Sequence, residues 1–189
     1  DVAVVTNIGI GDHLGLNYIT TVEDLAVLKR VIVQNVAPDG TAVLNAADPI
    51  VARMAASCPG SVTFFAADAQ LPLMATHRAQ GHRVVYVDGD AIVAAHGDSE
   101  QRITLTDIAI TRRGTIGFQV ENAMAVVGAA WALGLDWHAV RAGMRSFVSD
   151  AQTVPGRFNV FDHRGATGDT HEQHHAAPCA AGSRSAMPP

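Results

Sequence analysis

Long hydrophobic runs, clustered basic residues and paired cysteines are all missing from the 189-residue sequence. No apolar run approaches the roughly 18 residues that span a bilayer, and no basic segment precedes the first apolar stretch, which argues against a membrane-spanning or exported chain. The net charge is −5 and the 13 Lys and Arg residues are scattered, which argues against a nucleic-acid-binding surface. Cys58 and Cys179 lie far apart without a C-x-x-C pair, which argues against a disulfide scaffold or zinc site and favours a reducing, cytoplasmic setting.

Two further features are missing at the level of motifs. The glycine-rich phosphate-binding loop G-x-x-x-x-G-K-[ST] does not occur, and the first residue is Asp1 rather than Met. An apolar strand is expected to begin immediately at Val2. We therefore expect the chain to be an internal piece that starts within a domain.

The residues that are present predict a folded α/β chain, since 48% are hydrophobic and only 16% are charged. The first third alternates between apolar runs typical of buried strands and capped segments typical of helices. Thr20 and Thr21 with Glu23 and Asp24 make overlapping capping-box patterns, and Asp48-Pro49 predicts another helix start. The expected strands are residues 2–8, 42–44 and 62–65, and the expected helices are residues 21–33 and 49–57. This order predicts a doubly wound, mostly parallel sheet covered by helices.

The middle of the chain changes character. Short strands separated by Asp and Gly turns are expected at 83–87, 91–95 and 103–110, which predicts a small antiparallel section. Two helices are then expected at 121–133 and 137–147, the second with Asp136 as its cap.

Three parts follow from this organisation. We expect a partial domain over 1–154, a linker with the start of a new domain over 155–167, and no regular structure over 168–189, where His, Ala, Pro, Ser and Gly show no period. The last part is either a natural flexible tail or the product of a frameshift in a GC-rich gene. We favour the frameshift, because a polar tract stands where an apolar strand is expected.

The strongest local motif is the segment Thr6 to Leu14, in which a strand runs into a glycine-rich turn that presents Asp12 and His13. Open α/β sheets bind ligands beyond the carboxyl ends of their strands. A neutral imidazole at that position can ligate a cation or contact a phosphate. The same residues can instead build a tight turn in which Asp12 is the cap.

This stretch resembles Mur-ligase-type enzymes, in which a T-N-I strand end and a D-H-L turn precede a helix that bears a lysine. Lys29 is that lysine here. The resemblance implies that Lys29 is carbamylated and that it and His13 hold magnesium, which prefers hard oxygen ligands. Taken alone, Lys29 reads as a solvated helix lysine.

Two downstream motifs strengthen the resemblance. The run from Gly117 to Ala125 is similar to the family's helix start, where an asparagine, here Asn122, hydrogen-bonds the adenine of ATP. The family's usual H-N is replaced by Phe118-Gln119, and this F-x-V-E-N form favours the cyanophycin synthetase branch. The motif around Arg157 is similar to the linker whose arginine reaches the nucleotide phosphates, although Asn159 stands where the family usually has glutamate.

The resemblance covers the chain to about Ala166 and implies a Mur-ligase central domain with ATP and Mg²⁺ as cofactors. Enzymes of this branch join arginine to aspartate side-chain carboxylates of a cyanophycin primer through an acyl phosphate, and the full-length enzyme is expected to be a homo-oligomer. Because the phosphate-binding loop is missing, we expect the isolated chain to be inactive. The alternatives are a non-catalytic Rossmann-like binding module and a fragment of a Mur or folylpolyglutamate ligase. The histidines outside these motifs, His77 among them, are expected at the surface.

Overall fold

The computed structural model describes residues 1–9, 19–149, 152, 157–163 and 166–171, the last two ranges by their backbone alone. Asp12 and His13 lie outside the described residues.

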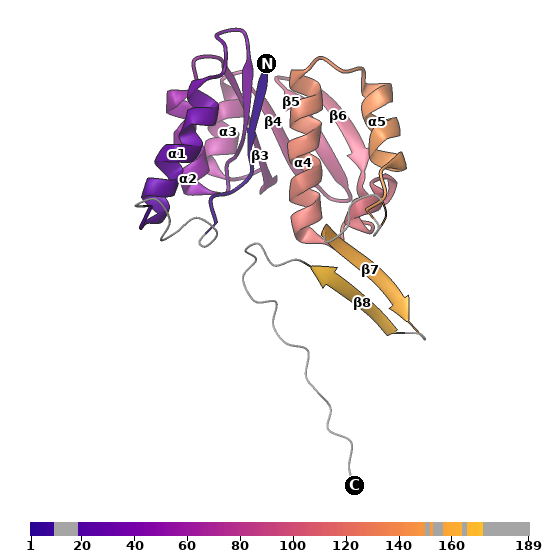
Figure 1. Ribbon diagram of the computed structural model, residues 1–189. Coiled ribbons are helices and arrows are strands. Elements are labelled where there is room, and N and C mark those ends of the chain that lie inside the picture. The colour runs from indigo at the N-terminus through magenta and orange to yellow at the C-terminus, as the bar shows by residue number, and fades with distance from the viewer. Residues whose placement is uncertain (10–18, 150–151, 153–156, 164–165, 172–189) are drawn as a thin grey trace.

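The fold is built on one mixed sheet whose strands follow their order in the chain (Figure 1). The strands are β1 (Val2–Val5), β2 (Thr41–Asn45), β3 (Ser61–Asp68), β4 (Arg83–Asp88), β5 (Ala91–His96) and β6 (Ser99–Thr104). The pairs from β1 to β4 are parallel, whereas β4 to β6 pair antiparallel. The expected fold class, a mostly parallel sheet with helices and a small antiparallel section, is confirmed.

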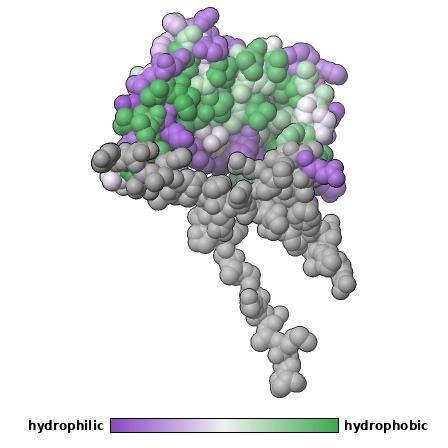
Figure 2. Space-filling view, viewed as in Figure 1, coloured by the Kyte–Doolittle hydropathy of each residue, from purple (hydrophilic) through white to green (hydrophobic). Residues whose placement is uncertain are grey.

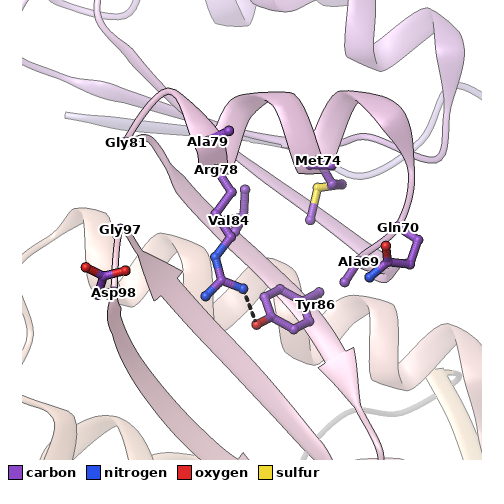
Figure 3. Close-up of a pocket in the computed structure, with 11 residues that line it drawn as sticks. Ala69, Gln70, Met74, Arg78, Ala79, Gly81, Val84, Tyr86, Gly97 and Asp98 are labelled. Carbon is purple, nitrogen blue, oxygen red and sulfur yellow. Dashed lines mark hydrogen bonds between the residues drawn. The ribbon is translucent and has the colours of Figure 1, made fainter.

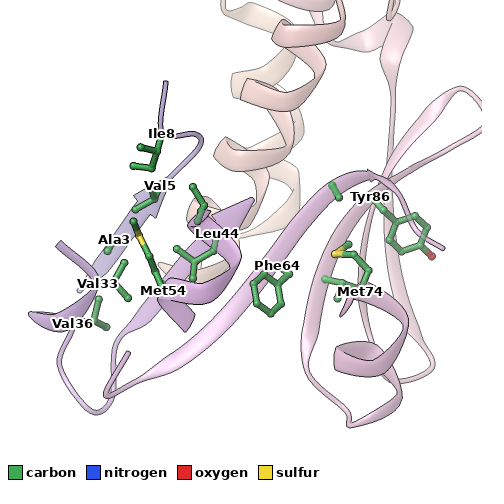
Figure 4. Packing of buried hydrophobic residues seen from close by; sticks show 14 of the residues in the cluster. Ala3, Val5, Ile8, Val33, Val36, Leu44, Met54, Phe64, Met74 and Tyr86 are labelled. Atoms are coloured by element: carbon green, nitrogen blue, oxygen red, sulfur yellow. The ribbon is translucent and has the colours of Figure 1, made fainter. Parts of the chain in front are cut away.

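Helices cover both faces of this sheet (Figure 1). They are α1 (Val22–Gln34), α2 (Pro49–Arg53) with a 3₁₀ turn (Met54–Ser57), α3 (Pro72–Ala79), α4 (Gly117–Ala132) and α5 (Trp137–Ser146). The alternation of strand side chains divides the core: Leu44 and Phe64 pack on the side of α1 to α3 (Figure 4), and Val43 and Phe65 pack under α4. In the described residues, every helix is too short or too polar to cross a membrane.

Two helix starts follow the cap signals of the sequence. Thr21 and Asp24 form a capping box at the start of α1, in which each side chain accepts a hydrogen bond from the other residue's backbone N–H. Asp136 accepts hydrogen bonds from the N–H groups of His138 and Ala139 at the start of α5. Both predicted caps are confirmed.

Only some of the apolar residues of α1 are buried. Leu25 and Val33 are buried, but a stripe of four apolar residues on the same helix is about half exposed. This stripe consists of Val27, Leu28, Val31 and Ile32. Figure 2 shows hydrophobic residues gathered on this face of the molecule. Among the described residues, the opposite side of α1 contacts β1, α2 and the 3₁₀ turn Met54–Ser57.

One local prediction is wrong, and one helix was not predicted. The strand expected over 103–110 ends at Thr104, and 3₁₀ turns follow at Leu105–Asp107 and Ala109–Thr111. The buried Thr111 hydroxyl lies within hydrogen-bond distance of the Leu105 and Ile108 carbonyls, at 3.1 and 2.8 Å, and this bonding folds the segment back on itself. Helix α3 was not expected, because its start has no side-chain cap.

A hairpin of β7 (Arg157–His163) and β8 (Ala166–His171) ends the described chain. Strand β7 begins at Arg157, within the stretch where the start of a new domain is expected, but the expectation of no regular structure from Gly168 is wrong as far as His171. Backbone pairing with β7 needs no apolar period, which is why the composition gave no sign of β8.

The prediction for His77 is also wrong, since it is half-buried rather than a surface residue. Its Nε2 lies 3.0 Å from the carbonyl oxygen of Val62, and its ring packs edge-on against Phe64 at 4.7 Å between centroids. Burial lowers the pKa of His77, and the nearby His82 lowers it further.

The close approach of α4 to the sheet depends on Gly128. A Cβ atom at this position would lie 2.8 Å from Cγ1 of Val43, a buried and stiff β-branched side chain. We expect Gly128→Ala to lower the free energy of unfolding by about 1–2 kcal/mol through overpacking, despite the better helix propensity of alanine. Gly143→Ala is the matched control, because nothing lies within 4 Å of its Cβ position on α5, and it should stabilise by roughly 0.5–1 kcal/mol. Equal effects in urea unfolding would contradict this packing.

The buried His77 predicts a pH dependence. Because its folded-state pKa lies below the ordinary 6.5, the unfolded chain binds this proton more tightly. The stability that neutral His77 contributes is therefore fully present above pH 6.5, and it is lost as the pH falls through the lowered folded-state pKa. His77→Gln should flatten the decrease in unfolding free energy between about pH 7.5 and 5.5, whereas His138→Gln, at an exposed position, should not. Parallel curves for both variants would show that His77 does not cause the decrease.

Candidate functional site at the carboxyl edge of the sheet

The candidate site lies where the parallel strands end. Val5 of β1 pairs with Leu44 of β2, so the chain leaves both strands at the same edge. The segment after β1 continues to Ile8, and the segment after β2 continues to Asp48. Ligands of open α/β sheets bind at such an edge, which makes it the candidate site.

Asp48 joins the two exits. Its Oδ2 accepts a 3.0 Å hydrogen bond from the backbone N–H of Ile8, forty positions earlier in the chain. Its Oδ1 accepts hydrogen bonds from the N–H groups of Ile50 and Val51 at 2.8 and 3.2 Å, which caps α2. One carboxylate therefore both starts a helix and holds the chain that leaves the neighbouring strand.

The start of α1 is held at this edge by another carboxylate. Asp24 accepts hydrogen bonds from the N–H groups of Thr20 and Thr21 at 3.1 and 3.0 Å. The pKa of Asp24 lies below its usual value. The largest cause is its hydrogen bonding with the Thr21 side chain, and the two backbone hydrogen bonds lower the pKa further. Ile8, which follows β1, and Thr20 and Thr21, which precede α1, are thus each held by an aspartate side chain.

Helix α4 brings Asn122 toward the same edge. Ala132, at the end of α4, lies with Thr41 and Ser61 around one hollow at the amino ends of β2 and β3. Asn122 precedes Ala132 by ten residues, or about 15 Å of helix, and so lies toward the carboxyl edge. Its exposed amide donates a 3.2 Å hydrogen bond to Oε1 of Gln119. An amide has one acceptor and two donors, so capacity for a ligand remains.

A strained turn leads into α4. Arg112 and Arg113 have positive φ values of 47° and 62°, which side-chain-bearing residues adopt at a cost. The Thr111 hydroxyl holds this turn, because it also accepts a 3.0 Å hydrogen bond from the N–H of Gly114. A hollow of about 240 Å³ opens beside the turn. Its lining includes Arg112, Ile116, Gln119, Val148 and Ser149.

The structure brings only some of the sequence-predicted site residues together. Lys29 is half-exposed in the middle of α1, and Arg157 is the first residue of β7. No group of three or more His, Cys, Asp or Glu side chains that suits a metal occurs in the described residues, which do not include His13. These described residues alone therefore do not form a magnesium site.

A larger cavity, of about 500 Å³, lies elsewhere between α3 and the β4 to β6 strands (Figure 3). Arg78 crosses it, donating hydrogen bonds of 2.7 Å to both the Tyr86 hydroxyl and Glu100. The guanidinium charge is thus paired within the protein, and Glu100 raises the pKa of Arg78. Neither Lys29 nor Asn122, the predicted site residues whose side chains the structure describes, lines this cavity, so its size does not make it the candidate site.

Sequence reasoning missed Asp48 and Thr111 as parts of the site. Asp48-Pro49 carried a helix-start signal, which is confirmed, but nothing local indicates the bond to Ile8. Thr111 lay within a stretch expected to be a strand. The positive φ at two consecutive arginines has no sequence signal, apart from the glycine that follows them.

Comparisons with known proteins agree with this geometry. Cyanophycin synthetases from Geminocystis herdmanii and a Synechocystis strain are 40% and 39% identical to the chain over 86% of its length. The chain spans only 18% and 19% of the length of these two relatives. MurF from Acinetobacter baumannii has a similar fold, with a TM-score of 0.59 at 18% identity over 89% of this chain and 33% of MurF. The family model of the Mur ligase middle domain matches residues 1–130. The chain therefore belongs to the Mur ligase middle domain family.

Proposed function

We propose that the chain is the nucleotide-binding part of an ATP-dependent ligase of the cyanophycin synthetase type, which joins arginine to aspartate side-chain carboxylates. The position of Asn122 carries this proposal, because α4 presents its exposed amide at the edge where α/β sheets bind ligands. The 40% identity to a cyanophycin synthetase supports this branch of the family.

In this proposal the adenine lies at the start of α4. The Asn122 amide pairs with one donor and one acceptor of the adenine edge, and its hydrogen bond to Gln119 fixes its orientation. The hollow of about 240 Å³ beside Gln119 is large enough for part of a ligand, though smaller than a complete drug-sized site. The Thr111 bonds hold the turn that forms its wall.

The reaction follows from the chemistry of amide formation. A carboxylate oxygen of aspartate attacks the γ-phosphorus of ATP, and ADP leaves, giving an acyl phosphate. The arginine amine then attacks the acyl carbon, loses a proton and releases phosphate. Catalysis of such a transfer consists mainly of positioning and charge stabilisation. Arg157 is proposed to contact the nucleotide phosphates, and His13 with carbamylated Lys29 to hold the magnesium that neutralises phosphate charge when bound.

The wider organisation is also part of this proposal. Residues 1–154 are proposed to form a partial ligase central domain and residues 155–167 to link it to the next domain, and the tail expected after residue 167 is proposed only beyond His171, where β8 ends. The enzyme acts in the cytoplasm, where ATP and free thiols such as Cys58 are maintained. We propose that the longer enzyme is a homo-oligomer.

Nucleotide binding can be mapped directly on the purified chain. Adding a non-hydrolysable ATP analogue with Mg²⁺ at millimolar concentration should shift the amide NMR signals of residues 117–123. Asn122→Ala should weaken this binding about tenfold, because two hydrogen bonds to the base are lost. Glu121→Ala is the matched control, since it changes the neighbouring exposed residue and should bind as the wild type does. Shifts confined to other parts of the chain would contradict the proposed site.

The same chain is expected to be inactive in catalysis. Without a G-x-x-x-x-G-K-[ST] loop, no backbone N–H cradle and lysine hold the β- and γ-phosphates. The purified chain should therefore form neither ADP nor aspartyl-arginine from ATP, aspartyl primer and arginine in a coupled assay. ATP-dependent ligation by the chain alone would show this expectation to be wrong.

A further inference from the structure

We propose that Asp48 is a positioning residue of this edge: its carboxylate fixes the direction in which the chain leaves β1. The hydrogen bond from Ile8 N–H to Asp48 Oδ2 is the direct observation, at 3.0 Å. Its relevance to ligation rests on the proposed function, but the bond itself does not.

The geometry gives the Asp48 carboxylate a second role besides capping α2, which is to hold the backbone of Ile8. Capping needs one oxygen, and Oδ1 alone accepts the bonds from Ile50 and Val51. Oδ2 is left for Ile8, whose N–H has no strand partner because β1 ends at Val5. A charged acceptor makes this bond stronger than one to a neutral oxygen.

Burial supports the same reading. The Ile8 side chain is only 9% exposed and belongs to the core cluster under α1 to α3 (Figure 4). Its backbone N–H is held by Asp48 while its side chain is held by apolar packing. Two independent contacts therefore fix the position and direction of one residue just beyond the strand.

The carboxylate is connected rigidly to the rest of the edge. Asp48 follows β2 by three residues, and Asn45, the last residue of β2, is itself buried and accepts a 2.8 Å hydrogen bond from Ala47 N–H. The turn that carries Asp48 is thus organised by its own side-chain bonds. Movement of Ile8 requires either breaking this turn or breaking the Asp48 bond.

Asp48→Ser separates the two tasks of this residue. A serine hydroxyl caps a helix well, but its shorter side chain has one oxygen and no second acceptor for Ile8. Asp136→Ser is the matched control, because Asp136 caps α5 without a bond to a distant strand exit among those described. Both variants should unfold at temperatures close to that of the wild type.

Amide hydrogen exchange and NMR shifts at Ile8 test the proposal. In Asp48→Ser, exchange of the Ile8 amide should accelerate at least tenfold and its proton signal should move upfield. Asp136→Ser should leave both unchanged. Asp48→Glu, which restores a second acceptor, should recover part of the protection. An Ile8 amide unaffected by Asp48→Ser would overturn the proposal.

A nucleotide titration separates this proposal from the proposed function. If the wild type binds the ATP analogue, Asp48→Ser should weaken binding and Asp136→Ser should not. Equal affinity of both variants would limit Asp48 to a structural role and overturn its positioning role. If the wild type binds no nucleotide, the proposed function fails, while the Ile8 measurements still decide whether Asp48 fixes the chain exit.

Discussion

The parallel pairing of β1 to β4 is the constraint on which the rest of the structure depends. Parallel neighbours need crossover helices, and each crossover returns the chain to the same starting edge. The exits of the strands therefore gather at the opposite edge, where Ile8 and Asp48 meet. Helix α4 can lie over the other face of this sheet because Gly128 has no side chain to hold it away from Val43.

Most elements of the parallel section could be predicted because their signals are local. The apolar run of β2 and the capping box at Thr21 each lie within a few residues of the element that they define. The end of β6 and helix α3 could not be predicted in this way. Thr111 turns the chain after β6 through bonds to carbonyls several residues earlier, and α3 begins without a cap. The exposed stripe on α1 shows a related limit, because an apolar pattern does not show what covers it.

The candidate site was predictable to a similar extent. The motif around Asn122 indicated a residue that the structure places on an exposed face of α4, near the edge that the strand order predicts. The hydrogen bond from the Ile8 N–H to Asp48 was not predictable, because these two residues are forty positions apart in the sequence. Lys29 and Arg157 remain predictions that the family resemblance carries. The proposed partners of these two residues, which are magnesium with His13 and the nucleotide phosphates, are not among the side chains that the structure describes.

The central claim is that ATP binds with its adenine at the start of α4. Photo-crosslinking with 8-azido-ATP places a covalent label on residues next to the base, so it tests this claim most directly. After irradiation and proteolysis, the account predicts labelled peptides from residues 109–123, with labelling suppressed by excess unmodified ATP. Competable labelling confined to the cavity that Arg78 crosses, between α3 and the β4 to β6 strands, would contradict the account.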